Sequence, residues 1–215
     1  MTLRLDAVSI TLHGRALVPA LSAEVQPGEV LAVMGPSGSG KSSLLAWLAG
    51  LLEPPLAGQG RLLLDGLDVS LLPVERRRIG LLFQDDLLFP HMSVLDNLLF
   101  ALPAGASRAE RVTEAMAALA AAGLDGLAQR RPHQLSGGQR ARVSLLRTLL
   151  ARPAAVLLDE PYSRLDATLR AQLRDFVWAS LRERGVPAVL VTHDEQDVPP
   201  GARCLRLADL GAGRA

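Results

Sequence analysis

The sequence predicts an α/β protein with a mainly parallel sheet, an antiparallel β part at its N-terminus and an inserted α-helical subdomain. Continuous apolar runs at 30–34, 156–158 and 188–192 are typical of strands that are buried on both faces, as in parallel sheets. Helical patterns separate these runs, and alternation of strands and helices favours a parallel core. The stretch 84–133 is mainly helical in pattern and interrupts the alternation, which predicts the insertion.

The N-terminal part is predicted to be β structure. Apolar residues alternate over 3–12 with an irregularity, and 21–25 forms a second short run. After the buried strand at 30–34 comes a glycine-rich loop and then a helix over 42–52, which Pro54 and Pro55 end.

The remaining elements follow from the same periodicities. Strands are expected at 61–64, 79–83 and 204–207, and helices at 93–102, 108–122, 136–151 and 167–184. The tail 211–215 is expected to be frayed.

Composition narrows the function classes. The chain has 215 residues, a formal net charge of +1 and one cysteine, Cys204. So weak a charge gives no reason to expect nucleic acid as a partner, and one thiol cannot form an internal disulfide. No signal-peptide pattern and no apolar stretch of about 18 residues occurs, so we expect a cytosolic protein or the peripheral part of a membrane assembly.

A phosphate-binding motif lies between the strand at 30–34 and the following helix. It matches G-x-x-x-x-G-K-[ST] and comprises Gly35, Pro36, Ser37, Gly38, Ser39, Gly40, Lys41 and Ser42, with Ser43 next in the helix. The glycines let backbone N–H groups face a phosphate, and the helix adds its positive end. We therefore expect ATP and Mg²⁺ here, with Lys41 at the β- and γ-phosphates and Ser42 as a metal ligand. A chance match is on the order of one percent in a chain of this length.

Two carboxylates, Asp159 and Glu160, end the buried run at 156–158. Ligands of parallel sheets lie beyond the carboxyl ends of the strands. Asp159 is expected to hold the Mg²⁺ shell through water, and Glu160 to act as the base or to orient the attacking water. Alone, the pair could equally be a polar strand end. The phosphate loop in the same chain makes the catalytic interpretation much stronger.

A second glycine-rich helix start is formed by Leu135, Ser136, Gly137, Gly138 and Gln139. It offers another anion-binding helix end. The segment resembles the LSGGQ signature of ATP-binding cassette (ABC) ATPases, and the resemblance spans nearly the whole chain. It implies a P-loop NTPase core of ABC type in which the signature of one subunit closes over the ATP of another, hence a dimer of two copies. One ABC domain, 1–215, is expected, with an ATP-binding core at 1–83 and 152–215 and a helical signature subdomain at 84–151.

Further positions match this family in order. The resemblance implies that Gln84 senses Mg²⁺, that Asp166 meets the partner subunit, and that His193 contacts the γ-phosphate. Read alone, each has an ordinary structural explanation, and only their order and context favour function. Two positions depart from the family pattern: Leu12 stands where an aromatic residue usually stacks on adenine, and Arg164 stands where many relatives have Ala.

The segment 87–94 resembles the importer pattern that receives a coupling helix from a membrane subunit. The resemblance implies integral membrane permease subunits as partners, a solute-binding protein indirectly, and a peripheral location on the cytoplasmic face of the bacterial inner membrane. The family's C-terminal regulatory domain of sugar importers is expected to be missing. The segments 82–85 and 140–143, together with 192–194 and 196–199, resemble the YnjD type within the family.

Two alternative functions share parts of this pattern. A non-transport ABC ATPase of division type, acting through membrane partners, stays open. A P-loop kinase or GTPase is disfavoured by the signature and by the lack of an Asn-Lys-x-Asp guanine motif.

Overall fold

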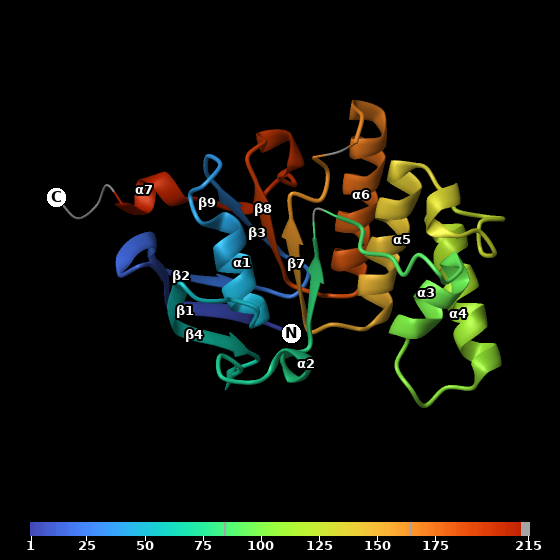
Figure 1. Ribbon diagram of the computed structural model, residues 1–215, viewed down its shortest axis with the longest axis horizontal. Helices are drawn as coiled ribbons and strands as arrows, with labels where there is room; N and C mark the ends of the chain where they lie inside the picture. Colours follow the sequence, from blue (N-terminus) through green and yellow to red (C-terminus); the bar gives the residue numbers. More distant parts are fainter. Residues whose placement is uncertain (84, 164, 212–215) are drawn as a thin grey trace. The chain divides into compact units, whose positions relative to one another are not determined.

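The computed structural model describes residues 1–83, 85–163 and 165–211 (Figure 1). The chain divides into two compact units. We call Met1–Leu81, Ala154–Glu160 and Trp178–Ala215 the core unit, and Leu82–Pro153 with Pro161–Val177 the helical unit.

The antiparallel sheet of the core unit has the strand order β2-β1-β4-β5. Its strands are β1 (Leu3–Leu12), β2 (Arg15–Val25), β4 (Leu56–Leu64) and β5 (Leu67–Asp68). The predicted irregularity in β1 is confirmed: the register with β4 shifts between Asp6 and Ser9. The shift brings the backbone of β1 close to Gly60 of β4, where only glycine is accommodated, because a Cβ would lie 2.6 Å from Cα of Val8.

The second sheet of the core unit has the order β6-β7-β8-β3-β9. Its strands are β3 (Val30–Met34), β6 (Ile79–Leu82), β7 (Ala155–Asp159), β8 (Ala188–Thr192) and β9 (Arg203–Arg206). The pairs β3–β8, β3–β9 and β7–β8 are parallel. Every residue of β3 and β8 is buried, as the continuous apolar runs predicted. The parallel core is thereby confirmed.

Helix α1 (Lys41–Ala49) packs against strands of both sheets, so one hydrophobic core serves the whole unit (Figure 1). The helix is shorter than expected because Gly50 takes a left-handed cap with φ 82°. The buried Arg77, at the end of α2 (Val74–Arg77), donates to the carbonyls of Trp47 and Leu48 at 2.9 and 3.0 Å. This cation satisfies carbonyls that every helix end leaves open.

The C-terminal part of the core unit contains two short elements that were not predicted. They are the 3-10 turn η2 (Glu195–Asp197) and helix α7 (Leu207–Gly211), which packs against β2.

The helical unit contains α3 (Val94–Ala101), α4 (Arg108–Ala121), the 3-10 turn η1 (Pro132–Gln134), α5 (Gly137–Leu150) and the first part of α6 (Ala167–Glu183). Serine side chains cap α3, α4 and α5 by accepting from an amide of the first turn. Leu98, Leu119 and Val143, at most 1% exposed, form the centre of the core of this unit. In the described part of the chain, no helix is long and apolar enough to cross a membrane.

Candidate functional site

The phosphate motif forms the connection from β3 to α1 in the core unit. Gly38 and Gly40 have φ of +81° and +90°, in the left-handed region that favours glycine. A Cβ on Gly40 would also lie 2.6 Å from Cγ2 of Val18 in β2. The loop is thus held against the antiparallel sheet, and its shape presents the free amides at the start of α1 to a ligand.

Lys41 turns back over the loop. Its Nζ donates to the carbonyls of Gly35 at 2.8 Å and Pro36 at 2.9 Å, and the side chain is 6% exposed. The hydroxyl of Ser39 is buried in the same loop and has no hydrogen-bond partner among the described residues. A cation and an unused donor therefore lie within the phosphate loop.

Ser42 and Asp159 meet at the carboxyl end of β7. The Ser42 hydroxyl donates to Oδ1 of Asp159 at 3.1 Å. Burial raises the pKa of Asp159, although the hydrogen bond from Ser42 opposes the shift. The site therefore holds a desolvated carboxylate beside a hydroxyl, which are oxygen ligands suited to a hard cation.

Glu160 has a strained backbone, with φ 44° in the left-handed region. Its amide donates to the carbonyl of Val191 in β8 at 3.0 Å, which fixes the residue at the sheet edge. Its Oε1 lies 3.1 Å from Nδ1 of His193. Two predicted site residues that are 33 positions apart in the sequence thus form a direct pair.

Hydrogen bonds of the neighbouring Thr192 stabilise the loop that carries His193. The hydroxyl of Thr192 donates to Oδ2 of the buried Asp197 at 2.6 Å and accepts from the amide of Asp194 at 3.1 Å. Sequence reasoning missed Asp197. The only signal was an acidic residue in the short loop after a fully apolar strand, and nothing in it indicated burial.

The signature residues lie in the helical unit. Ser136 and Gln139 form a capping box: the Ser136 hydroxyl accepts from the Gln139 amide at 3.2 Å, and Oε1 of Gln139 accepts from the Ser136 amide at 2.9 Å. Gly138 is required by packing, because a Cβ there would lie 1.9 Å from Cδ2 of Leu169 in α6. Gly137 is exposed, and Leu135 is buried.

The other predicted positions are placed as follows. Asp166 belongs to the helical unit, and its Oδ1 accepts from the amide of Leu169 at 3.0 Å at the start of α6. Leu12 is 38% exposed at the end of the β1–β2 hairpin, whose turn contains His13 and Gly14. Gln84 and Arg164 lie outside the described residues.

Comparisons with known proteins agree with this geometry. The family model described as "ABC transporter" matches residues 18–163. An uncharacterized ABC transporter ATP-binding protein of Escherichia coli K12, YnjD, is 46% identical over 94% of this chain and 93% of its own length. The Fe(3+) ions import ATP-binding protein FbpC 1 of Rhizobium meliloti is 42% identical over 84% of this chain, which spans about half of that relative (50%).

Among solved structures, the dimeric post-hydrolysis state of the ATP-binding cassette MJ0796, bound to ADP and Pi, superposes with a TM-score of 0.79. It is 30% identical and is matched over 95% of this chain and 93% of its own. The resemblance that the motifs indicated is confirmed, including the YnjD type. This chain belongs to the ABC transporter family of ATP-binding cassette ATPases.

Proposed function

We propose that this protein is the ATP-hydrolysing subunit of a bacterial ABC importer, in which ATP closes two copies of the chain and hydrolysis reopens them. The observation that carries the proposal is the cluster at the phosphate loop. Lys41, Ser42, Asp159, Glu160 and His193 come from three separate segments and meet at the carboxyl edge of one parallel sheet. Ligands of α/β sheets bind at this edge.

ATP is bound chiefly through its phosphates. In this proposal the backbone amides of 35–43 surround the β-phosphate, and Lys41 exchanges its bonds to the loop carbonyls for the β- and γ-phosphate oxygens. The strand that ends at Leu12 contains no Tyr, Phe or Trp, so we expect weak or apolar stacking of the adenine and weak selectivity for the base.

The residues present suit Mg²⁺. The Ser42 hydroxyl and the Asp159 carboxylate supply hard oxygen atoms 3.1 Å apart, and the resemblance adds Gln84. Within the described part of the chain, no group of three acidic, histidine or cysteine residues forms a complete metal site. Mg²⁺ commonly takes its remaining ligands from substrate phosphates and water, and when bound it neutralises phosphate charge.

Hydrolysis then needs a positioned water molecule and stabilisation of the negative charge on the γ-phosphate and on the departing ADP. Glu160 orients the water by accepting a hydrogen bond from it. The left-handed backbone of Glu160 keeps the carboxylate at the sheet edge. His193 links that carboxylate to the γ-phosphate, since its Nδ1 already contacts Glu160. Changing either side chain should therefore affect the chemical step more than binding.

The signature completes the site of a second copy. The capping box of Ser136 and Gln139 fixes the first turn of α5, and the exposed Gly137 leaves backbone amides accessible to a γ-phosphate. Asp166, at the start of α6, would face the partner. In this proposal a core at 1–83 and 152–215 holds the phosphate loop and a subdomain at 84–151 holds the signature, while 161–177, with Asp166, belongs to the same compact unit as the signature.

Import is supported by the relatives. Besides FbpC 1, a spermidine/putrescine import ATP-binding protein of Vibrio cholerae is 38% identical over 91% of this chain. These names favour import over a division-type role. In this proposal permease subunits dock on the surface around 87–94, a solute-binding protein supplies the cargo, and the chain lies on the cytoplasmic face of the inner membrane. Leu87 and Phe100 are 54% and 65% exposed in the helical unit, as a docking surface requires.

Turnover of ATP by the purified protein tests the site. Lys41→Ala should abolish hydrolysis while the fold is retained, because the apolar residues with which α1 packs in the core are unchanged. Circular dichroism melting provides the control for folding. Hydrolysis by the variant at the parent rate would show that the phosphate loop is not the active site.

A further inference from the structure

One face of α5 binds the segment that follows position 84. Arg140, Ser144 and Arg147 are spaced four and three residues apart, so they project from the same side of the helix. Each donates a hydrogen bond to residues 86–87. The signature helix and this segment are thus fastened together along two turns.

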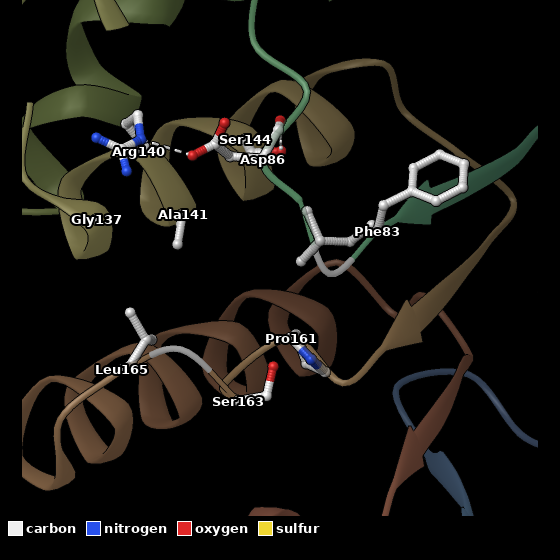
Figure 2. A pocket seen from close by; sticks show the side chains of 10 residues that line it. Phe83, Asp86, Gly137, Arg140, Ala141, Ser144, Pro161, Ser163 and Leu165 are labelled. Atoms are coloured by element: carbon white, nitrogen blue, oxygen red, sulfur yellow. Dashed lines mark hydrogen bonds and ion pairs between the residues drawn. The ribbon is translucent and has the colours of Figure 1, made fainter. Parts of the chain in front are cut away.

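Arg140 makes two bonds that join distant parts of the helical unit, and Figure 2 shows the one to Asp86. Its Nε donates to Oδ2 of Asp86 at 2.7 Å, and its Nη1 donates to the carbonyl of Leu135 at 2.9 Å. Leu135 is the first residue of the signature. One guanidinium therefore ties the segment after position 84 to the backbone that leads into the signature.

The two other side chains hold the same segment further along. The buried Ser144 hydroxyl donates to the Asp86 carbonyl at 2.7 Å. Nη1 of Arg147 donates to the Leu87 carbonyl at 2.9 Å, and its guanidinium lies 5.4 Å from the ring centre of Phe89. These contacts fix the backbone of the segment, whereas only Arg140 reaches back to the signature.

The Asp86–Arg140 pair lines a pocket of about 160 Å³ in the helical unit. Gly137 and Ala141 line the pocket on the side of α5, and Pro161, Ser163 and Leu165 face them from the segment after Glu160 (Figure 2). The start of α5 is therefore held by the hydrogen bonds of Arg140 as well as by the packing of Gly138 against Leu169 of α6.

We propose that Asp86 and Arg140 are a positioning pair that holds the signature loop in register with residues 86–89. Movement of that segment, which adjoins the proposed docking surface, changes the position of the Leu135 carbonyl and so of the amides that follow it. The assignment of those amides to a second copy's ATP rests on the proposed function. The ion pair between Asp86 and Arg140, called the bridge below, does not rest on the proposed function.

Amide hydrogen exchange of the nucleotide-free protein tests the bridge directly. Asp86→Asn should speed exchange of the peptide covering 135–140 about fivefold, the upper range for a pair that is about one-third exposed. Asp86→Glu, which retains the carboxylate, should restore most of the protection. Exchange in the double variant Asp86→Asn, Arg140→Gln should be no faster than in Arg140→Gln alone, because Arg140→Gln already removes the interaction with Asp86.

Glu114→Gln is the matched control, since it breaks the Glu114–Arg152 pair of the same unit at 3.1 Å. It should leave exchange at 135–140 unchanged. Unchanged exchange in Asp86→Asn, or equal effects of Asp86→Asn and Glu114→Gln, would overturn the bridge.

Kinetics separate this inference from the proposed function. Asp86→Asn should raise the ATP concentration for half-maximal turnover about fivefold and leave ATP binding to single subunits unchanged. An unchanged half-maximal concentration would contradict the positioning role. Lack of turnover by the parent protein would contradict the proposed function, while the exchange result would still decide the bridge.

Discussion

Gly40 offers a test of the phosphate loop that removes no chemical group. It precedes α1 with φ +90°, and a Cβ would lie 2.6 Å from Cγ2 of Val18 and 2.9 Å from Cγ of Leu17. Gly40→Ala therefore meets both a backbone restriction and a steric one. If ATP binding depends on the shape of the backbone, this single methyl group should weaken it.

The size of the effect follows from the two penalties. A left-handed conformation costs a residue with a Cβ about 1–2 kcal/mol, and overpacking costs about 1–3 kcal/mol. Together they disfavour the binding-competent loop by about 2–5 kcal/mol. Since each 1.4 kcal/mol is a factor of ten, the dissociation constant for ATP should rise at least about 30-fold.

Titration with a fluorescent ATP analogue measures this constant. Gly14→Ala is the matched control, because Gly14 has φ +78° and open space around a Cβ. It should lose about 1–2 kcal/mol of unfolding free energy and bind ATP normally. A dissociation constant for Gly40→Ala within about threefold of the parent would refute the backbone argument, as this is far below the roughly 30-fold expected.

Two more predictions concern the carboxylate and the docking surface. Burial raises the pKa of Asp159, so its ionised form is less favourable in the folded than in the unfolded chain. Asp159→Asn should therefore raise the melting temperature at pH 7, and the gain should shrink as the pH falls toward the ordinary pKa of an aspartate; turnover should fall about 100-fold. A lower melting temperature at pH 7 would contradict the assigned shift. Phe100→Asp should prevent copurification of a multi-span membrane protein, because it places a charge on the proposed docking surface, where the ring centres of Phe100 and Phe89 are 4.9 Å apart. Basal ATP turnover should not change, because Phe100 is not part of the ATP site. Undiminished copurification would exclude that surface.

Features of the site set by short-range pattern were predictable from the sequence. The phosphate loop and the signature are continuous segments, and their glycines, lysine and capping serine specify loop and helix start locally. The parallel strands were predictable because full burial leaves continuous apolar runs. That Glu160 and His193 belong to one site followed only from the family resemblance, since the sequence alone does not specify the strand order, and their direct contact was not predicted.

Features that depend on tertiary contacts were not predictable. The end of α1 is set by Gly50 together with Arg77, which reaches the helix from a separate segment. The burial of Asp197 depends on the hydroxyl of Thr192. The bridge from Asp86 to Arg140 joins residues 54 positions apart, with no periodic signal in either segment.

ATP-dependent association of the Glu160→Gln variant tests the central claim most directly, because it asks whether the site needs a second copy. Glu160→Gln retains the size of the side chain but lacks the carboxylate that orients water, so ATP should persist at the site. Light scattering after size-exclusion chromatography with ATP and Mg²⁺ should give about twice the 22.9 kDa mass of one chain, returning to one chain without nucleotide. A variant that binds ATP yet keeps the mass of a single chain at saturating nucleotide would contradict the shared site.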